Sequence, residues 1–256
     1  MADKLDRADK HLGDLKRRLH AFNREYSNSV VFEDDPHTGD RTYKIASIPP
    51  FDKDIPLIAG DAVHNIRTAL DHLACRLVFV GTSGQGPFDD VYFPIGDTPK
   101  QYKSKLRGVV KRLTPEAIQA INTVEPYEGG RGHDVWRLHR LDIVDKHRLP
   151  LGVEPTNSLQ SMAPSERANL ARYFLSVRTI PSGSVMLTAP PIAHFPLQAG
   201  HELCTVPHAD VEQDMHFHFD IALNEPGIVQ GESLLETLKG MLDLVRNVVA
   251  DFAPLL

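Results

Sequence analysis

The chain has 256 residues, of which 41% are hydrophobic and 24% are charged, and its formal net charge is -6. This composition excludes a disordered chain and is typical of a folded protein that can bury a sizeable core. Because the first twenty residues are highly charged, we expect no secretory signal, and no apolar run approaches the roughly 20 residues of a membrane span. We therefore expect a cytoplasmic protein with no membrane partner.

Periodicity and turn residues predict mainly helices in the first 150 residues. Leucines at helical spacing indicate a helix over residues 2–25, and two β-rich runs around DPHTGD indicate a hairpin. We expect Asp61 to cap a helix that runs to about residue 80. Three further helices are predicted in the remainder of this half, at residues 100–113, at 114–124 with Thr114 as the cap, and from residue 134 to before Pro150.

The second half of the chain is predicted to be rich in strands. Residues 151–167 have turn composition, and YFLSVRTI, SVMLTA, ELCTV and MHFHFDIAL then indicate strands. A broad apolar stripe predicts a last helix within residues 231–256. The expected fold is a single α+β domain: a helical bundle (about 1–150 and 231–256), an N-terminal β-hairpin, and an antiparallel sheet (about 168–222) inserted before the C-terminal helix.

The segment HNIRTALDH, residues 64–72, carries an unusual polar face. At about 100° per residue, its His, Asn, Arg, Thr and Asp side chains lie opposite an apolar face. The polar face has no Lys or Glu, the usual residues of a solvent-exposed helix. This composition favours a face that contacts a ligand or a partner, with His64 as a substrate-binding residue.

Arg67 and His72 form an Arg-x4-His pattern, which resembles the Arg-x4-6-His motif of HEPN-domain proteins. The resemblance implies a helical bundle, commonly dimeric, and many members are metal-independent endoribonucleases. By this resemblance Arg67 would hold a phosphate and His72 would act as general acid or base, with Asn65 and Asp71 orienting them. RNA and a second copy of the chain are then the expected partners, and no cofactor or metal is expected. From spacing alone, Asp71 is also placed to form an ion pair with Arg67.

The predicted helix from residue 134 is the second candidate. Its end, DKHR, is rich in charge for a helix with apolar residues on both flanks, so we expect it to face HNIRTALDH. Arg67, His72, Asp145 and His147 would then share one cleft. The candidate substrate-binding residues here are Arg140, Asp145, Lys146, His147 and Arg148.

The positive charges of the chain are concentrated in its first half. Residues 1–150 hold 23 of the 28 Lys and Arg and 22 of the 34 acidic residues. Within them, KQYKSKLRGVVKR (100–112) has six positive charges and no acidic residue. Such a run suits a phosphate backbone, although a solvated helix face has the same composition.

Two other classes of function stay open. A metal site could use Asp61, His64, His72, Asp142, Asp145 and His147, although the chain has no Glu-x-x-His pair. His133-Asp134 resembles a metal-binding His-Asp dyad, but we expect it to lie in a glycine-rich loop and not on a helix. His216, His218 and Asp220 share one strand face at a spacing that suits metal ligands, but an exposed polar strand face has the same pattern. The remaining alternative is a structural or interaction protein whose polar helix faces close a dimer or bind a partner.

Overall fold

The computed structural model describes residues 1–147, 150–157, 198–206 and 219–256. Its helices and strands, in chain order, are α1 (Ala2–Asn28), β1 (Val30–Asp34), β2 (Arg41–Ile45), α2 (Asp54–Gly81), α3 (Pro99–Val109), η1 (Val110–Arg112), α4 (Pro115–Val124), α5 (His133–His147), β3 (Val153–Asn157), β4 (Glu202–Val206), β5 (Phe219–Glu225), β6 (Val229–Ser233), α8 (Leu234–Phe252) and η4 (Ala253–Leu255). The predicted α+β class is confirmed.

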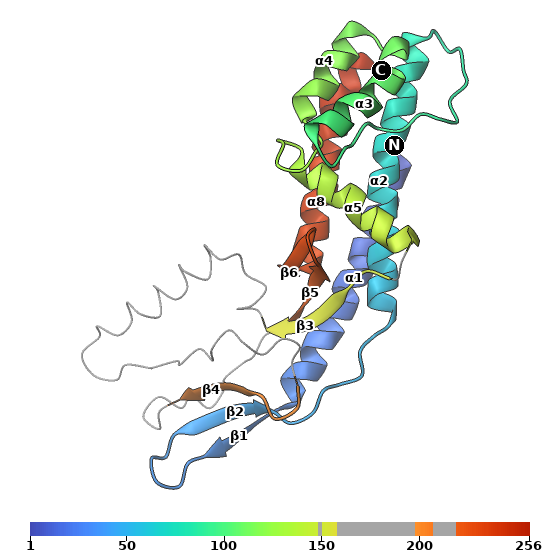
Figure 1. Cartoon of the computed structure of the whole chain (residues 1–256). Coiled ribbons are helices and arrows are strands. Elements are labelled where there is room, and N and C mark those ends of the chain that lie inside the picture. Colours follow the sequence, from blue (N-terminus) through green and yellow to red (C-terminus); the bar gives the residue numbers. More distant parts are fainter. Residues whose placement is uncertain (148–149, 158–197, 207–218) are drawn as a thin grey trace, which may run out of the picture.

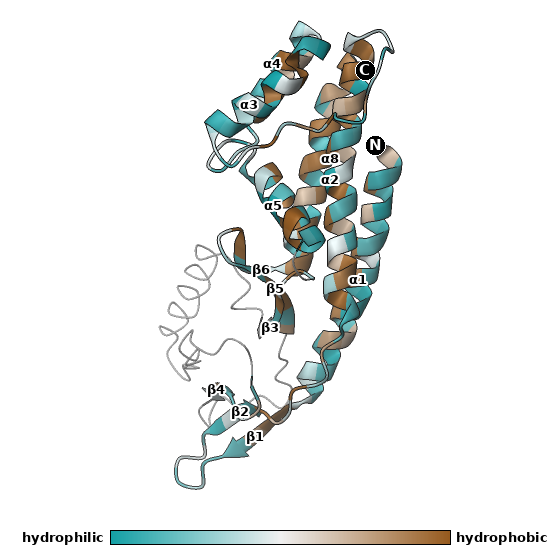
Figure 2. Ribbon diagram, turned by 45° about the vertical axis from the view of Figure 1, so that its right-hand side comes forward, coloured by the Kyte–Doolittle hydropathy of each residue, from teal (hydrophilic) through white to brown (hydrophobic). Residues whose placement is uncertain are grey.

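Three long helices form the centre of the bundle. α1, α2 and α8 pack against one another, and α5 packs against α2 and α8 (Figures 1 and 2). The buried side of α1 consists mainly of leucines and aromatic residues at helical spacing, whereas the opposite side is hydrophilic. α2 is buried on most of its circumference, and its small residues Ala59, Gly60 and Ala62 allow neighbouring helices to approach closely.

The described part of the chain has two small antiparallel sheets, one beyond the lower end of α1 and one beside α1 (Figure 1). The predicted hairpin of β1 and β2 is confirmed, and β4 pairs with β2 to give the order β1-β2-β4. The second sheet has the order β3-β5-β6 and contacts α8 through β5 and β6. Its buried residues Phe219, Ile221 and Leu223 continue the core of the bundle.

The structure corrects the predicted start of α2. The helix begins at Asp54, so Asp61 lies inside it and caps nothing. Pro56 and Gly60, residues that commonly interrupt helices, both precede the predicted cap. Pro56 is tolerated because it lies in the first helical turn, where backbone N–H groups have no intrahelical partner.

Two strands, β3 and β6, occur where no strand was predicted. β3 lies within the segment of turn composition, and its Pro155 is compatible with a strand that pairs on one side, with β5. β6 occupies the expected start of the last helix, which begins at Leu234 instead. The predicted strands YFLSVRTI and SVMLTA lie outside the described residues.

The predicted short helices are confirmed as α3 and α4. Thr98 and Thr114 cap them, since their side chains accept hydrogen bonds from the backbone N–H groups of Gln101 and Ala117 (both 3.2 Å). Gly96 packs directly under the first turn of α3, where a Cβ atom would lie 2.3 Å from the backbone nitrogen of Tyr102. The position of α3 therefore depends on a residue without a side chain.

We expect Gly96→Ala to lower the free energy of unfolding by about 1–3 kcal/mol, because the added methyl group overlaps backbone atoms. The matched control is Gly108→Ala in α3, where nothing lies within 4 Å of the added atom. That change should raise the free energy of unfolding by about 0.5–1 kcal/mol. Urea denaturation measures both, and equal effects of the two substitutions would contradict the close approach at Gly96.

Candidate functional site

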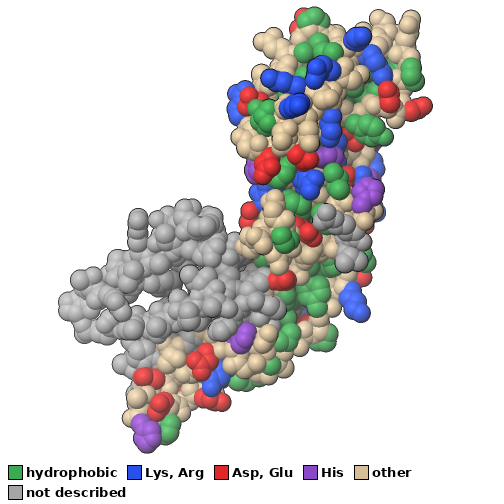
Figure 3. Space-filling view, in the orientation of Figure 1, with side chains coloured by type: hydrophobic (Ala, Val, Ile, Leu, Met, Phe, Trp, Pro, Cys, Tyr) green, Lys and Arg blue, Asp and Glu red, His purple; other side chains and the backbone are tan. Residues whose placement is uncertain are grey.

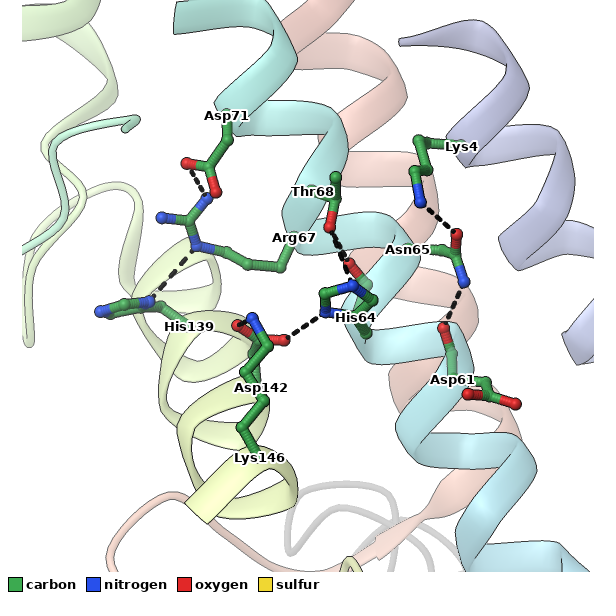
Figure 4. Close-up of polar contacts among 10 residues, drawn as sticks. All are labelled: Lys4, Asp61, His64, Asn65, Arg67, Thr68, Asp71, His139, Asp142 and Lys146. Carbon is green, nitrogen blue, oxygen red and sulfur yellow. Dashed lines mark hydrogen bonds and ion pairs between the residues drawn. The ribbon is translucent and has the colours of Figure 1, made fainter. Parts of the chain in front are cut away.

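Polar side chains gather where α2 packs against α5 (Figure 4). We call this group the α2–α5 polar cluster. Its members are His64, Arg67, Thr68 and Asp71 of α2 and His139, Asp142 and Lys146 of α5.

Asp142 is the most buried carboxylate of this cluster, with a side chain 6% exposed. One of its oxygens lies 3.1 Å from Nδ1 of His64, and the other accepts a hydrogen bond from Nζ of Lys146 at 2.8 Å. Because a carboxylate only accepts hydrogen bonds, the imidazole of His64 must carry a proton on Nδ1. In the neutral ring Nε2 then holds the lone pair, on a side chain that is 43% exposed.

Thr68 lies beside the free nitrogen of His64. Its Oγ1 is 3.5 Å from Nε2, but the hydroxyl already donates to the backbone carbonyl of His64 at 2.7 Å. Such a bond to the preceding helical turn is common for threonine in helices. Thr68 therefore lines the site and is not an activated nucleophile.

Arg67 belongs to a second part of the cluster and is almost fully buried, with a side chain 5% exposed. Its Nη1 donates to Asp71 at 2.6 Å, and its Nε donates to Nδ1 of His139 at 3.3 Å. Asp71 also accepts the backbone N–H of Phe93 at 2.9 Å. The predicted ion pair thus exists, and it ties the segment after α2 to the helix.

His139 is held in its neutral form. Its pKa is lowered to about 4, mainly by burial and also by the positive charges of Arg67 and Lys105, against the opposing effect of Asp142 and Asp97. Since Nδ1 accepts from Arg67, the proton of the neutral ring lies on Nε2. His64 and His139 therefore present opposite tautomers within one cluster.

Asp145 lies against α2 at Gly60, where a Cβ atom would come within 2.2 Å of the carboxylate. Burial raises the pKa of Asp145, as do the negative charges of Asp142 and Asp61, and His64 and Lys146 oppose the shift. Part of the DKHR segment does face the helix of HNIRTALDH.

The structure does not bring Arg67 and His72 together within one chain. His72 is exposed on the side of α2 that faces the start of α1. Desolvation lowers its pKa, and so do the terminal amino group and Lys4, whereas Asp71 opposes the shift. Asn65 also faces α1, where it accepts from Lys4 (3.3 Å) and donates to the backbone carbonyl of Asp61 (2.7 Å).

The remaining candidates on α5 are also dispersed. Arg140 lies 3.6 Å from Asp97, which in turn accepts a hydrogen bond from the indole of Trp136 at 2.9 Å. Lys146 belongs to the cluster through Asp142, whereas His147 is exposed and Arg148 lies outside the described residues. The expected shared cleft of Arg67, His72, Asp145 and His147 is therefore not formed within the chain.

The alternative metal sites gain no support from the described part of the chain. Among those residues, no group of three or more His, Cys, Asp or Glu side chains could hold a metal ion. His133 is the first residue of α5, not a loop residue as expected, and its ring stacks on Trp136. Asp134 pairs with Arg137, while His216 and His218 lie outside the described residues.

His139 was not among the predicted site residues, and Asp142 was predicted only as a metal ligand or as a charge that needs a partner. A helical projection of α5 contains the signal, because His139, Asp142 and Lys146 fall within about 60° of one another. This narrow polar stripe lies between apolar flanks, where polar residues need partners on a neighbouring helix. The hydrogen bond from Phe93 to Asp71 could not be predicted in this way, because Phe93 donates it from its backbone N–H group and not from its side chain.

Comparisons of the chain with protein-family models, curated proteins and solved structures find no match. Evidence for the function of the cluster therefore comes from its geometry. In the described part of the chain, no helix is both long enough and apolar enough to span a membrane.

We expect Asp71→Asn to lower the free energy of unfolding by about 3–5 kcal/mol, because it leaves the buried guanidinium of Arg67 without its carboxylate. The control is Asp9→Asn, the same chemical change in an exposed pair with Arg246 (3.3 Å). That substitution should cost at most about 1 kcal/mol. Similar losses for the two variants in urea denaturation would contradict the structural role of the Arg67–Asp71 pair.

We expect the contribution of His139 to the free energy of unfolding to decrease as the pH is lowered from 7 to 5. Its folded pKa of about 4 lies below the ordinary value of 6.5, so the unfolded state binds the proton first in this window. The predicted loss is about 2 kcal/mol, and it should be missing from His139→Gln. Urea denaturation of both proteins at several pH values measures the difference. Parallel pH profiles would show that His139 is not held neutral.

Proposed function

We propose that the α2–α5 polar cluster is a metal-independent acid–base centre that cleaves RNA. The observation that carries this proposal is the His64–Asp142 pair. A buried carboxylate fixes the imidazole tautomer, and Nε2 is left as a base on a half-exposed ring. A cytoplasmic location belongs to the same proposal.

The proposed reaction needs one proton acceptor and one proton donor. Nε2 of His64 takes the proton of a ribose 2′-hydroxyl, and the 2′-oxygen attacks the adjacent phosphorus atom. The bond from phosphorus to the 5′-oxygen breaks, and the protonated imidazole returns its proton to that oxygen. The products are a 2′,3′-cyclic phosphate and a 5′-hydroxyl, and Asp142 stabilises the imidazolium formed in between.

The proposal differs from the expectation based on the HEPN motif. Arg67 is committed to Asp71 and His139, so its guanidinium is not available to hold a phosphate. Lys146, with a side chain 43% exposed, is the cation nearest to the His64–Asp142 pair and takes that role in the proposal. The HEPN-like identity and the homodimer remain proposals based on the Arg-x4-His pattern alone.

We expect the purified protein to cleave single-stranded RNA in excess chelator, and His64→Gln to reduce the rate by at least about 100-fold. The matched control is His72→Gln, a second histidine of α2 that faces α1. This control should retain the wild-type rate. Circular dichroism and denaturation of each variant check that the fold is intact.

The other outcomes of this experiment are equally informative. Activity lost to chelator would replace the proposal with a metal site. Loss of cleavage in His72→Gln, with His64→Gln active, would return the chemistry to the Arg-x4-His motif, for example across a dimer interface. Absence of cleavage in all proteins would contradict an RNA-cleaving centre.

A non-catalytic interaction protein is the second candidate. At the C-terminal end of α2, the adjacent apolar side chains of Phe79 (44% exposed) and Val80 (37%) contact solvent. Exposed apolar side chains that lie close together are typical of protein interfaces. This candidate predicts a dimer in solution and no cleavage, so analytical ultracentrifugation alongside the RNA assay distinguishes the two.

A further inference from the structure

α3 and η1 carry positive charges that the rest of the described chain does not neutralise. Lys100, Lys103, Arg107 and Lys111 are exposed, and none has a carboxylate within ion-pair distance among the described residues. Arg112 differs, because it pairs with Asp90 at 3.0 Å. Lys and Arg side chains gather on this upper end of the molecule in Figure 3. We call the four unpaired residues the α3 cation row.

The α3 cation row is linear. Lys100, Lys103 and Arg107 fall within about 60° of one another on the helix, and Lys111 follows one turn later in η1. The row extends over about 16 Å along the helix axis. Donors that converge on one point suit a single small anion, whereas a row of separated cations suits a linear polyanion.

A shallow groove follows the middle of the row. Lys103 and Arg107 line it together with Leu106 and Val110. Leu106 is buried in the core. The partly exposed Val110 and the aliphatic stems of the two cations therefore form the apolar surface that can contact sugars and bases, while the charged ends contact phosphates. The groove therefore complements a nucleotide chain better than it complements inorganic polyanions.

The row and the α2–α5 polar cluster lie on different sides of α3. Lys105, on the same helix but outside the row, is close enough to His139 for its charge to lower the pKa of that ring. Lys105 lies on the face of α3 opposite to the row, so a strand that follows the row lies on the far side of α3 from that ring. The chain as a whole has a net charge of -6, so such a strand is attracted locally and not by the overall charge.

We propose that the α3 cation row binds the phosphate backbone of single-stranded RNA. This inference extends the proposed cleavage function and rests on it for the choice of RNA as the polyanion. The row supplies affinity without sequence preference, because it contacts phosphates and presents no set of donors and acceptors for base edges.

The test measures binding of a fluorescent 2′-O-methyl RNA 20-mer by anisotropy, in chelator, between 50 and 200 mM salt. This RNA lacks the 2′-hydroxyl that the proposed reaction needs, so binding is measured whether or not the protein cleaves RNA. Four phosphate contacts predict a slope of about -2.8 for log affinity against log salt, or a roughly 50-fold loss across this range. Each single Lys→Gln substitution in the row should reduce the slope by about 0.7.

A quadruple variant removes the row, and a second quadruple variant is its matched control with the same change in net charge. The row variant is Lys100→Gln, Lys103→Gln, Arg107→Gln and Lys111→Gln. The control alters four exposed cations of α1: Arg7→Gln, Lys10→Gln, Lys16→Gln and Arg24→Gln.

The proposal predicts that the row variant loses RNA binding and that the α1 control keeps it. Equal losses in the two variants would overturn it, since only net charge would then matter. Binding to phosphatidylserine vesicles without binding to RNA would also overturn it, in favour of an anionic membrane surface. Tight RNA binding together with no cleavage of ordinary RNA would uphold the row and contradict the proposed catalytic centre.

Discussion

A charged group between two packed helices is costly unless partners compensate its lost hydration. Both helices of the α2–α5 pair contribute such a group, the carboxylate of Asp142 and the guanidinium of Arg67, and each is compensated across the interface or along its own helix. These contacts require one rotation and one axial position of α5 relative to α2. The arrangement of the remaining polar side chains follows from that position.

The same constraint divides the polar face of α2 into two parts with different surroundings. His64, Arg67 and Asp71 face α5 and the segment around Phe93, whereas Asn65 and His72 face α1. The Arg-x4-His pattern therefore combines two residues with different surroundings, Arg67 facing α5 and His72 facing α1. Arg67 contributes to the structure of the site, while the accessible imidazole of His64 and the cations of α3 are the groups positioned to meet a ligand.

Much of the fold could be predicted because its signals are local. Apolar spacing in α1 and α8, the turn between β1 and β2, and Thr114 before Pro115 are each determined by a few neighbouring residues. The start of α2 was misjudged because Pro56 is a helix breaker in the interior but not in the first turn. β3 was missed because a strand with one partner tolerates the Pro155 that a central strand would exclude.

The candidate site was less predictable, because its contacts depend on how helices rotate against each other. Spacing along α2 was enough to predict the Arg67–Asp71 pair, which lies within one helix. The His64–Asp142 and Arg67–His139 contacts join residues more than seventy positions apart, and nothing in either segment specifies the other. The correct expectation was that α2 and α5 meet, and the errors were His72 of α2 and His147 of α5, which lie outside the cluster.

The most direct test of this account is nitrogen-15 NMR of the imidazole rings at pH 7, with His64→Gln and His139→Gln used to assign the signals. The account predicts opposite neutral tautomers: a proton on Nδ1 of His64, donated to Asp142, and a proton on Nε2 of His139, whose Nδ1 accepts from Arg67. The same tautomer for both rings, or rapid exchange between tautomers as in a solvated imidazole, would contradict the hydrogen-bond network on which the proposed site depends.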